Sequence, residues 1–386
     1  MNSVTPSSVE QLASALREAA DKRQTVETMG NRSKLSMAGP VLPADVTICT
    51  AALKQVLQYE PNDLTISVEA GMPFAELQTL LAKNRQMIAL DPPFAASATV
   101  GGVIASNSSG PLRRSFGTAR DLLIGMRFAM LDGRLVSTGG MVVKNVAGLD
   151  MGKLMIGSFG TLAVITSVNF RLHPLPEATE TFLFSFPDVD AVVEKRDLVN
   201  QSALLPLAVD IVSPAAAARL GSRGYVLAIR AGGSPTVLAR YARELSGGER
   251  LTGNNEAAWW TSVSEFAAEF LRRHPSGLVL RISTPLAGVA PLLRTIPGPC
   301  ISRASSGVTY AYLTSDESLN SLWKAADRDG RSMVVEFAPA EVRTSKDLWL
   351  LGSSPRGADS FGMMKRVKQM FDPNGLLNRS RLYGRI

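Results

Sequence analysis

The sequence has few residues that bind metals or form disulfides. Its 386 residues include two cysteines, Cys49 and Cys300, and two histidines, His173 and His274. Two thiols provide neither a disulfide framework nor the four cysteines of an ordinary iron–sulfur cluster. Each histidine precedes a proline, and the two lack the spacing of metal ligands. We therefore expect no metal site, and we interpret both histidines as surface or turn residues.

Long apolar segments are also missing. No apolar run reaches the roughly 18 residues that a membrane-spanning helix needs, and the N-terminal residues lack the basic start and apolar core of a signal peptide. The hydrophobic content of 45% and the charged content of 19% are ordinary for globular proteins. These properties predict a cytoplasmic protein without an integral membrane segment, peripheral to the inner membrane at most through partners.

Acidic residues are scarce between Leu77 and Pro176. This stretch has four aspartates and no glutamate against ten lysines and arginines, so it carries +6 of the chain's formal net charge of +7. It also contains 12 of the 32 glycines, all between Gly101 and Gly160. Glycine lets backbone N–H groups approach a ligand closely, so the stretch predicts a site for a phosphorylated cofactor. We expect no nucleic acid, because the only aromatic residues of the stretch are five phenylalanines and no recognised module is present.

Apolar periodicity and turn residues divide the chain into alternating helices and strands. Helices are predicted at Val9–Ala20 (capped by Ser7 or Ser8), from Pro73 onward, and at Val237–Leu245, Ala257–Phe270, Leu319–Ala326 and Phe361–Phe371; strands are predicted at Thr25–Met29, Thr65–Ala70, Ile124–Leu131, Arg134–Ser137, Phe182–Phe186, Tyr225–Arg230, Leu278–Ile282 and Val308–Leu313. Asp132-Gly133 favours a tight hairpin turn. The alternation from Leu162 to Leu172 predicts a strand in a sheet with one buried face. The pattern is that of an α+β protein, and a boundary is expected at Pro176, where the composition changes.

The motifs exclude two common nucleotide-binding folds. No G-x-G-x-x-G follows the first expected strand, and G-x-x-x-x-G-K-[ST] does not occur, so neither a Rossmann nor a P-loop site is predicted. The sequence instead has an early loop, Gly30–Lys34, and a later series. That series includes A-T-V-G-G at 98–102, K-N-V-A-G-L-D at 144–150 and G-S-F-G-T-L-A-V-I-T at 157–166, and near the end M-K-R-V-K-Q-M-F-D-P-N-G follows at 364–375.

This ordered set resembles the flavin-binding domain of the vanillyl-alcohol oxidase / p-cresol methylhydroxylase (PCMH-type) superfamily. Within it, the chain more specifically resembles the FAD-binding E subunits of bacterial glycolate oxidase, and the resemblance covers nearly its whole length. The resemblance implies an α+β fold with a two-subdomain PCMH-type FAD-binding domain at 1–176. It further implies an α+β cap at 177–344 and a C-terminal segment at 345–386 that packs back on the FAD domain.

The resemblance also implies which residues bind FAD. The loop and the A-T-V-G-G turn would hold the pyrophosphate, a middle stretch would line the ribityl and adenosine portions, and a strand would meet the cofactor with its backbone. The corresponding positions are Gly30, Asn31, Arg32, Ser33, Lys34, Pro93, Thr99, Val100, Gly101 and Gly102; then Ser106, Ser109, Gly110, Gly117 and Asp121; then Lys144, Asn145 and Gly148; then Gly160, Val164, Ile165 and Thr166; and Asn378, which matches an asparagine near the flavin ring.

Several of these positions have alternative interpretations. Gly133, Gly139 and Gly140 are better read as turn glycines. Asp150 belongs to the K-N-V-A-G-L-D element but can equally cap a helix that begins at Met151. Arg113 and Arg114 can be either functional or a solvated face.

Departures from the family pattern affect the binding prediction. The early loop has Arg32 where glycine is usual, which can pair with pyrophosphate or weaken binding. The loop has no histidine to which FAD could be attached, so we expect a non-covalent flavin. The closing N-P-G-R of the family has become N-R-S-R at 378–381.

The sequence predicts binding of a flavin more strongly than catalysis. Related enzymes carry H-x-G-D-G-N-x-H elements that organise a metal and the substrate, and this chain has none, so the general base is unknown. The resemblance implies the FAD-binding subunit of a complex that oxidises glycolate or a similar small 2-hydroxy acid, with a second flavoprotein subunit and an iron–sulfur subunit as partners. Two alternatives stay open: an independent FAD-dependent dehydrogenase, and a non-catalytic scaffold that holds FAD weakly.

Overall fold

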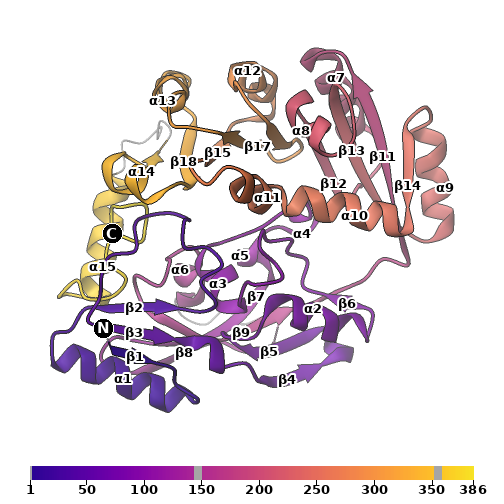
Figure 1. Cartoon of the computed structure of the whole chain (residues 1–386). Coiled ribbons are helices and arrows are strands. Elements are labelled where there is room, and N and C mark those ends of the chain that lie inside the picture. Colours follow the sequence, from indigo (N-terminus) through magenta and orange to yellow (C-terminus); the bar gives the residue numbers. More distant parts are fainter. Residues whose placement is uncertain (1, 143–149, 352–358) are drawn as a thin grey trace. The chain divides into compact units, whose positions relative to one another are not determined.

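The computed structural model describes residues 2–142, 150–351 and 359–386 (Figure 1). The chain divides into two compact units. The first contains Met1–Ser109, Gly117–Leu175 and Gly357–Ile386, and the second contains Gly110–Phe116 and Pro176–Arg356. Helices and strands are mixed in both units.

The first unit begins with a small parallel sheet of order β1-β3-β2. Its elements are β1 (Asn2–Val4), α1 (Val9–Asp21), β2 (Val26–Met29) and β3 (Val46–Cys49). Helix α1 starts where predicted, because the Ser8 side chain accepts a hydrogen bond from the Gln11 N–H.

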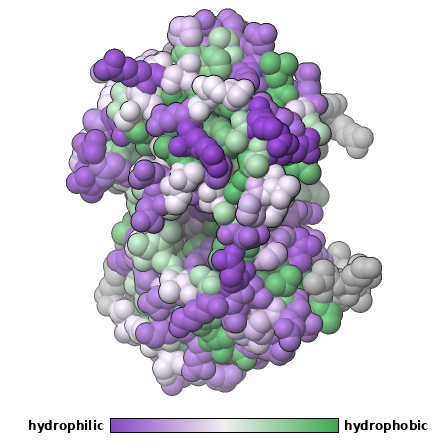
Figure 2. Space-filling model, turned by 90° about the vertical axis from the view of Figure 1, so that its right-hand side faces the viewer, coloured by the Kyte–Doolittle hydropathy of each residue, from purple (hydrophilic) through white to green (hydrophobic). Residues whose placement is uncertain are grey.

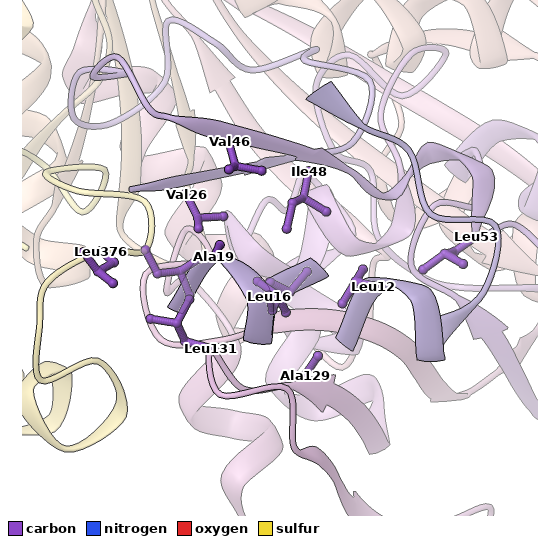
Figure 3. Close-up of a cluster of buried hydrophobic side chains, with 12 residues drawn as sticks. Leu12, Leu16, Ala19, Val26, Val46, Ile48, Leu53, Ala129, Leu131 and Leu376 are labelled. Carbon is purple, nitrogen blue, oxygen red and sulfur yellow. The ribbon is translucent and has the colours of Figure 1, made fainter. Parts of the chain in front are cut away.

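Helix α1 packs its apolar face on this sheet. Leu12 and Leu16 are fully buried against Val26 and Ile48, as Figure 3 shows. Burying such a leucine stabilises the fold by about 1.5–3 kcal/mol. This cluster fixes the end of β2, which leads into the early loop.

A five-stranded sheet of order β4-β5-β9-β7-β8 completes the first unit. The remaining elements of this part are β4 (Val56–Glu60), β5 (Thr65–Glu69), β7 (Leu123–Ala129), β8 (Leu135–Gly139) and β9 (Val164–Arg171), the short β6 (Gln86–Met87) and β10 (His173–Pro174), helices α2 (Phe74–Ala82), α3 (Val100–Ala105), α5 (Ala119–Leu122) and α6 (Met151–Met155), and 3-10 turns at Thr50–Ala52 and Pro61–Asp63. The predicted hairpin joins β7 to β8 around Asp132-Gly133.

Strand β9 differs from the prediction of one buried face. All five residues Val164–Val168 are buried, because β9 lies between β5 and β7 and also contacts α3. The hydroxyl of Thr166 is satisfied within this interior by donating to the Arg127 carbonyl at 3.0 Å. An alternating pattern with small polar residues thus encodes a strand that is buried on both faces over its first five residues.

The second unit is built on a nine-stranded sheet of order β14-β11-β13-β12-β16-β17-β15-β18-β19, in which all pairings are antiparallel. Its strands are β11 (Ala178–Phe186), β12 (Ala208–Val212), β13 (Tyr225–Gly233), β14 (Glu249–Thr252), β15 (Leu278–Ser283), β16 (Cys300–Arg303), β17 (Val308–Leu313), β18 (Ser332–Phe337) and β19 (Trp349–Leu350). Its helices are α4 (Arg113–Phe116), α7 (Val189–Gln201), α8 (Pro214–Arg219), α9 (Pro235–Glu244), α10 (Gly253–Ser264), α11 (Phe266–Arg273), α12 (Val289–Thr295), α13 (Leu319–Arg328) and α14 (Ala340–Ser345), with a 3-10 turn at Leu286–Gly288.

The C-terminal residues belong to the first unit. Helix α15 (Ser360–Phe371) is followed by a turn, and the chain then pairs with β2 through a parallel bridge between Val26 and Leu377. Leu376 and Leu377 join the hydrophobic cluster of Figure 3. The last residues of the chain therefore help to build the same core as the first.

The surface is mixed in character. On the face shown in Figure 2, hydrophilic and hydrophobic residues are interspersed. Within the described ranges, no helix combines the length and the apolar character that crossing a membrane requires.

Candidate functional site

A groove in the first unit brings together segments from both ends of the chain. It is about 840 Å³ in volume, including space open to solvent, and it continues into a neighbouring hollow of about 450 Å³ with which it shares seven residues. The walls come from the end of β2, the loops Gly30–Leu35 and Val41–Ala44, helix α3 with Thr99, the turn at Phe159-Gly160, the start of β9, and Asn378, Arg379 and Arg381.

The early loop presents backbone donors to this groove. The N–H groups of Asn31, Arg32 and Ser33 donate to no acceptor in the described part of the chain. Arg32 has a left-handed backbone with φ of 55°, a conformation that turns successive amides toward one concavity. The Arg32 guanidinium forms an ion pair with Glu27 at 3.2 Å. This donor set suits an anion.

The A-T-V-G-G turn has a different function from the one expected for its glycines. The N–H of Val100 donates to Met72, that of Gly101 to Ala70 at 2.7 Å, and that of Gly102 to the Thr99 hydroxyl at 3.2 Å. A Cβ atom at Gly101 would lie 2.8 Å from the Ala70 Cβ. Gly101 is therefore required for close packing, and its amide is already bonded.

Asn378 joins three segments of the groove wall. Its Oδ1 accepts from the Thr28 N–H at 2.7 Å, and its Nδ2 donates to the Thr28 hydroxyl and to the Phe159 carbonyl, each at 2.9 Å. Its own N–H donates to Val26. The Asn378 side chain lines the groove, but its two amide hydrogens are both used to hold the wall.

The cations of the groove come from the two ends of the chain. Arg32, Lys34, Arg379 and Arg381 line it, with Glu27 as the one carboxylate. Arg381 donates to the carbonyls of Met37 and Gly39, and Arg379 donates to that of Pro43 at 2.6 Å. Of the ten bases in the acid-poor stretch, none that the structure describes lines the groove; Lys153, for example, pairs with Asp150 at 2.8 Å. The excess positive charge of that stretch therefore did not identify the residues that supply the groove's cations.

The predicted cofactor-binding residues fall into three groups. Those that line the groove or its neighbouring hollow are Gly30, Asn31, Arg32, Ser33, Lys34, Thr99, Gly101, Gly102, Ser106, Gly160, Val164, Ile165 and Asn378. Those elsewhere in the first unit are Pro93, Val100, Ser109, Gly117, Asp121 and Thr166, whereas Gly110 belongs to the second unit. Lys144, Asn145 and Gly148 lie outside the described residues.

Two acidic residues of this region have local partners. The carboxylate of Asp121 accepts from the Thr118 N–H at 2.8 Å and so caps α5. Asp150 caps α6 by accepting from the Lys153 N–H. The capping interpretation of Asp150 is thus confirmed.

Sequence reasoning missed much of the groove. The missed lining residues are Val26, Glu27, Thr28, Met29, Leu35, Val41, Leu42, Ala44, Thr50, Ala70, Ala105, Phe159, Ala163, Arg379 and Arg381. Most are apolar residues whose position depends on tertiary packing. Arg379 and Arg381 could have been identified from the sequence, because they belong to the N-R-S-R ending that replaces N-P-G-R.

The groove contains no histidine that could act as a base. His173 lies in β10, which pairs with β6, and His274 is 3.1 Å from the Arg219 guanidinium in the second unit. Burial lowers the pKa of His173, and Arg171 lowers it further. Within the described ranges, no three histidine, cysteine, aspartate or glutamate side chains cluster to form a metal site. The arrangement can bind a large anion-bearing ligand, but it offers no evident proton acceptor.

Two regions of the chain match family models. Residues 3–139 match the model described as FAD binding domain, and residues 353–382 match FAD linked oxidases, C-terminal domain. Glycolate oxidase subunit GlcE of Escherichia coli (strain K12) is 27% identical over 377 residues, which are 97% of each chain. The D-lactate dehydrogenase of Archaeoglobus fulgidus is 30% identical over 211 residues, 54% of this chain and 46% of that protein. The chain therefore contains regions that match FAD-binding and FAD-linked oxidase models, and it is similar to a glycolate oxidase subunit over nearly its whole length.

Solved structures share the fold of this chain. The structure of p-cresol methylhydroxylase with substrate bound has a TM-score of 0.74 at 16% identity and covers 99% of this chain and 88% of that one. The predicted resemblance and the α+β class are therefore confirmed.

The matches to an FAD binding domain and to FAD linked oxidases indicate an FAD-linked oxidoreductase with FAD as its cofactor. The groove fits this molecule chemically. It combines free amides and cations, which suit a pyrophosphate, with an apolar wall that suits flat rings.

Proposed function

We propose that this protein is the FAD-binding subunit of a complex that oxidises glycolate, or a similar small 2-hydroxy acid, to the 2-oxo acid. The observation that carries the proposal is the similarity over 97% of both chains to a protein named as a glycolate oxidase subunit. D-lactate dehydrogenases among the relatives support a 2-hydroxy acid as the substrate class.

The groove supplies the means to hold FAD without a covalent bond. The free amides of Asn31, Arg32 and Ser33, with the cations Lys34 and Arg381, would bind the pyrophosphate. Val164, Ile165 and Ala163 form an apolar surface that excludes water from a bound ring. FAD, when bound, supplies the acceptor for the hydride of the substrate.

The composition of the site supports a partner that completes the reaction. Among the described residues that line the groove, Glu27 is the one carboxylate, and it is paired with Arg32. We propose that a second flavoprotein subunit activates the substrate and that an iron–sulfur subunit removes the electrons. Residues 1–176 would form the FAD domain, 177–344 the cap and 345–386 the returning segment, in a cytoplasmic protein that reaches the inner membrane only through its partners.

An absorption spectrum of the purified chain tests the proposal. We expect a yellow protein, or an apoprotein that regains a flavin spectrum when FAD is added. A colourless chain that cannot be reconstituted contradicts the cofactor assignment and favours the alternative of a non-catalytic scaffold.

Anaerobic addition of glycolate then separates the remaining functions. Bleaching is expected only when the second flavoprotein subunit is present. Bleaching of the isolated chain would show an independent dehydrogenase.

A further inference from the structure

Lys368 has an ammonium group that is enclosed behind the groove. Its side chain is 13% exposed. The Nζ atom donates to the Thr161 carbonyl at 2.7 Å, to Asp372 Oδ2 at 2.6 Å and to the Leu377 carbonyl at 2.9 Å. An ammonium has three hydrogens, so all of them are used, and Lys368 itself does not line the groove.

Each of the three acceptors belongs to a part that shapes the groove. Thr161 closes the turn 157–161, whose Phe159 and Gly160 line it. Leu377 directly precedes Asn378. Asp372 is 1% exposed, and its carboxylate accepts from the N–H groups of Leu376 and Leu377. One cation thus ties the turn to the C-terminal segment.

The other contacts of this turn lie at its earlier residues. Gly157 donates to Ile104, and Phe159 donates to Ala105, both at the end of α3. Asn378 donates to the Phe159 carbonyl at 2.9 Å. Lys368 holds the Thr161 end, from which the chain continues into Ala163, Val164 and the rest of β9. Lys368 therefore fixes the point from which the chain enters β9, and the pairing of β9 with β5 and β7 sets the rest of the strand.

Removing the ammonium while keeping the stem would release this end of the turn. The Thr161 carbonyl would lose its donor, and the Asp372 carboxylate would lose its cation inside the fold. A buried acceptor left unsatisfied is destabilising, and more so when it is charged. The turn would then move, and Phe159 and Gly160, which line the groove, would move with it.

We propose that Lys368 is a positioning residue for FAD, which sets the turn 157–161 and the C-terminal segment at the spacing that the cofactor needs. This inference rests on the proposed function only in that the groove is the flavin site. Nothing in the proposal requires Lys368 to touch the cofactor.

The test compares K368M with K365M in the full-length chain. Lys365 lies on the same helix and is exposed, so it controls for loss of a positive charge. FAD binding is measured by titration of the apoprotein, and the visible flavin band is recorded at saturating FAD. We expect K368M to raise the dissociation constant about tenfold or more, as the loss of about 1.4 kcal/mol would do, and to alter the fine structure of the band. K365M should match the wild type in both.

The possible results distinguish the role of Lys368 from FAD binding in the groove itself. A wild-type chain that binds no FAD contradicts the site and with it the role of Lys368. A wild-type chain that binds FAD, with K368M equal to it, overturns the role alone. If K368M does not fold by circular dichroism, K368R decides, because it keeps the charge beside Asp372 but replaces three converging donors by a planar group. Weakened FAD binding in folded K368R supports the proposal, and wild-type affinity overturns it.

Discussion

Asn378 and Thr28 are 350 residues apart in the sequence and exchange two hydrogen bonds. The Thr28 N–H donates to Asn378 Oδ1 at 2.7 Å, and Asn378 Nδ2 donates to the Thr28 hydroxyl at 2.9 Å. The same Nδ2 reaches the Phe159 carbonyl. One buried amide thereby aligns β2, the turn before β9 and the C-terminal segment around the groove.

We expect N378A to destabilise the fold. It leaves the Thr28 N–H and the Phe159 carbonyl without their partner, which should lower the free energy of unfolding by about 2–4 kcal/mol. Urea denaturation of the apoprotein measures this. N374A is the control, because Asn374 is exposed in the preceding turn, and it should change the free energy by less than about 0.5 kcal/mol. Equal midpoints for the two variants would refute the bridging function.

Gly101 and Gly102 should respond differently to alanine. At Gly101 the new Cβ would lie 2.8 Å from the Ala70 Cβ and 3.1 Å from the Ala70 carbonyl oxygen, so G101A should destabilise by about 1–3 kcal/mol. At Gly102 the only near atom is the Thr99 hydroxyl oxygen at 3.1 Å, so G102A should keep its stability. Because Gly102 lines the groove, G102A should instead weaken FAD binding. Thermal melts and FAD titration of both variants check the two effects, and a stable G101A would contradict the packing argument.

Asp45 should make the free energy of unfolding depend on pH in the acidic range. The Thr25 N–H and hydroxyl both donate to its carboxylate, at 2.8 and 2.7 Å, and they hold the pKa of Asp45 below its usual value. A carboxyl group with a lower pKa in the folded than in the unfolded chain stabilises above the unfolded pKa, and this effect is lost as the pH falls through the folded pKa.

The variant D45N should therefore melt below the wild type at neutral pH, and the gap should close as the pH falls through the pKa of Asp45 in the folded chain. Thermal melts from neutral to acidic pH measure the gap. D63N is the control, because Asp63 is an exposed acid on the same unit. A gap that stays constant with pH would show that Asp45 acts by something other than its charge.

The two cysteines should differ in reactivity toward a thiol reagent. Burial raises the pKa of Cys300 to about 12, and the residue is 1% exposed, whereas Cys49 is partly exposed. Since the thiolate is the reactive form, one thiol should react quickly at pH 8 in the native protein and two after denaturation. C49S should abolish the fast reaction. Two fast thiols in the native chain would contradict the buried position of Cys300.

Local signals in the sequence predicted many elements but only part of the groove. Strand β17 occupies Val308–Leu313 as predicted, because β-branched and aromatic residues bounded by turns identify a strand from neighbouring residues alone. The Gly30–Lys34 loop could also be located from neighbouring residues, because it directly follows an expected strand. In contrast, Arg381 is held at the groove because it donates hydrogen bonds to the carbonyls of Met37 and Gly39. No local sequence pattern predicts a contact between residues from the two ends of a chain.

The charge of the acid-poor stretch shows the same limit. Net charge along a sequence says nothing about the direction in which each side chain points. Arg134 pairs with Asp132 at 2.7 Å on the hairpin, and Arg114 donates to the Pro206 carbonyl in the second unit. The groove's cations had to be located in three dimensions.

The bridge between Val26 and Leu377 has a consequence for how the protein acquires its flavin. A nascent chain that has emerged only as far as α14 has the early loop but lacks the wall made by Asn378, Arg379 and Arg381. The groove comes into existence only after residues 376–381 leave the ribosome. A chain shortened before residue 376 lacks these wall residues, and we expect it to bind FAD more weakly than the full chain.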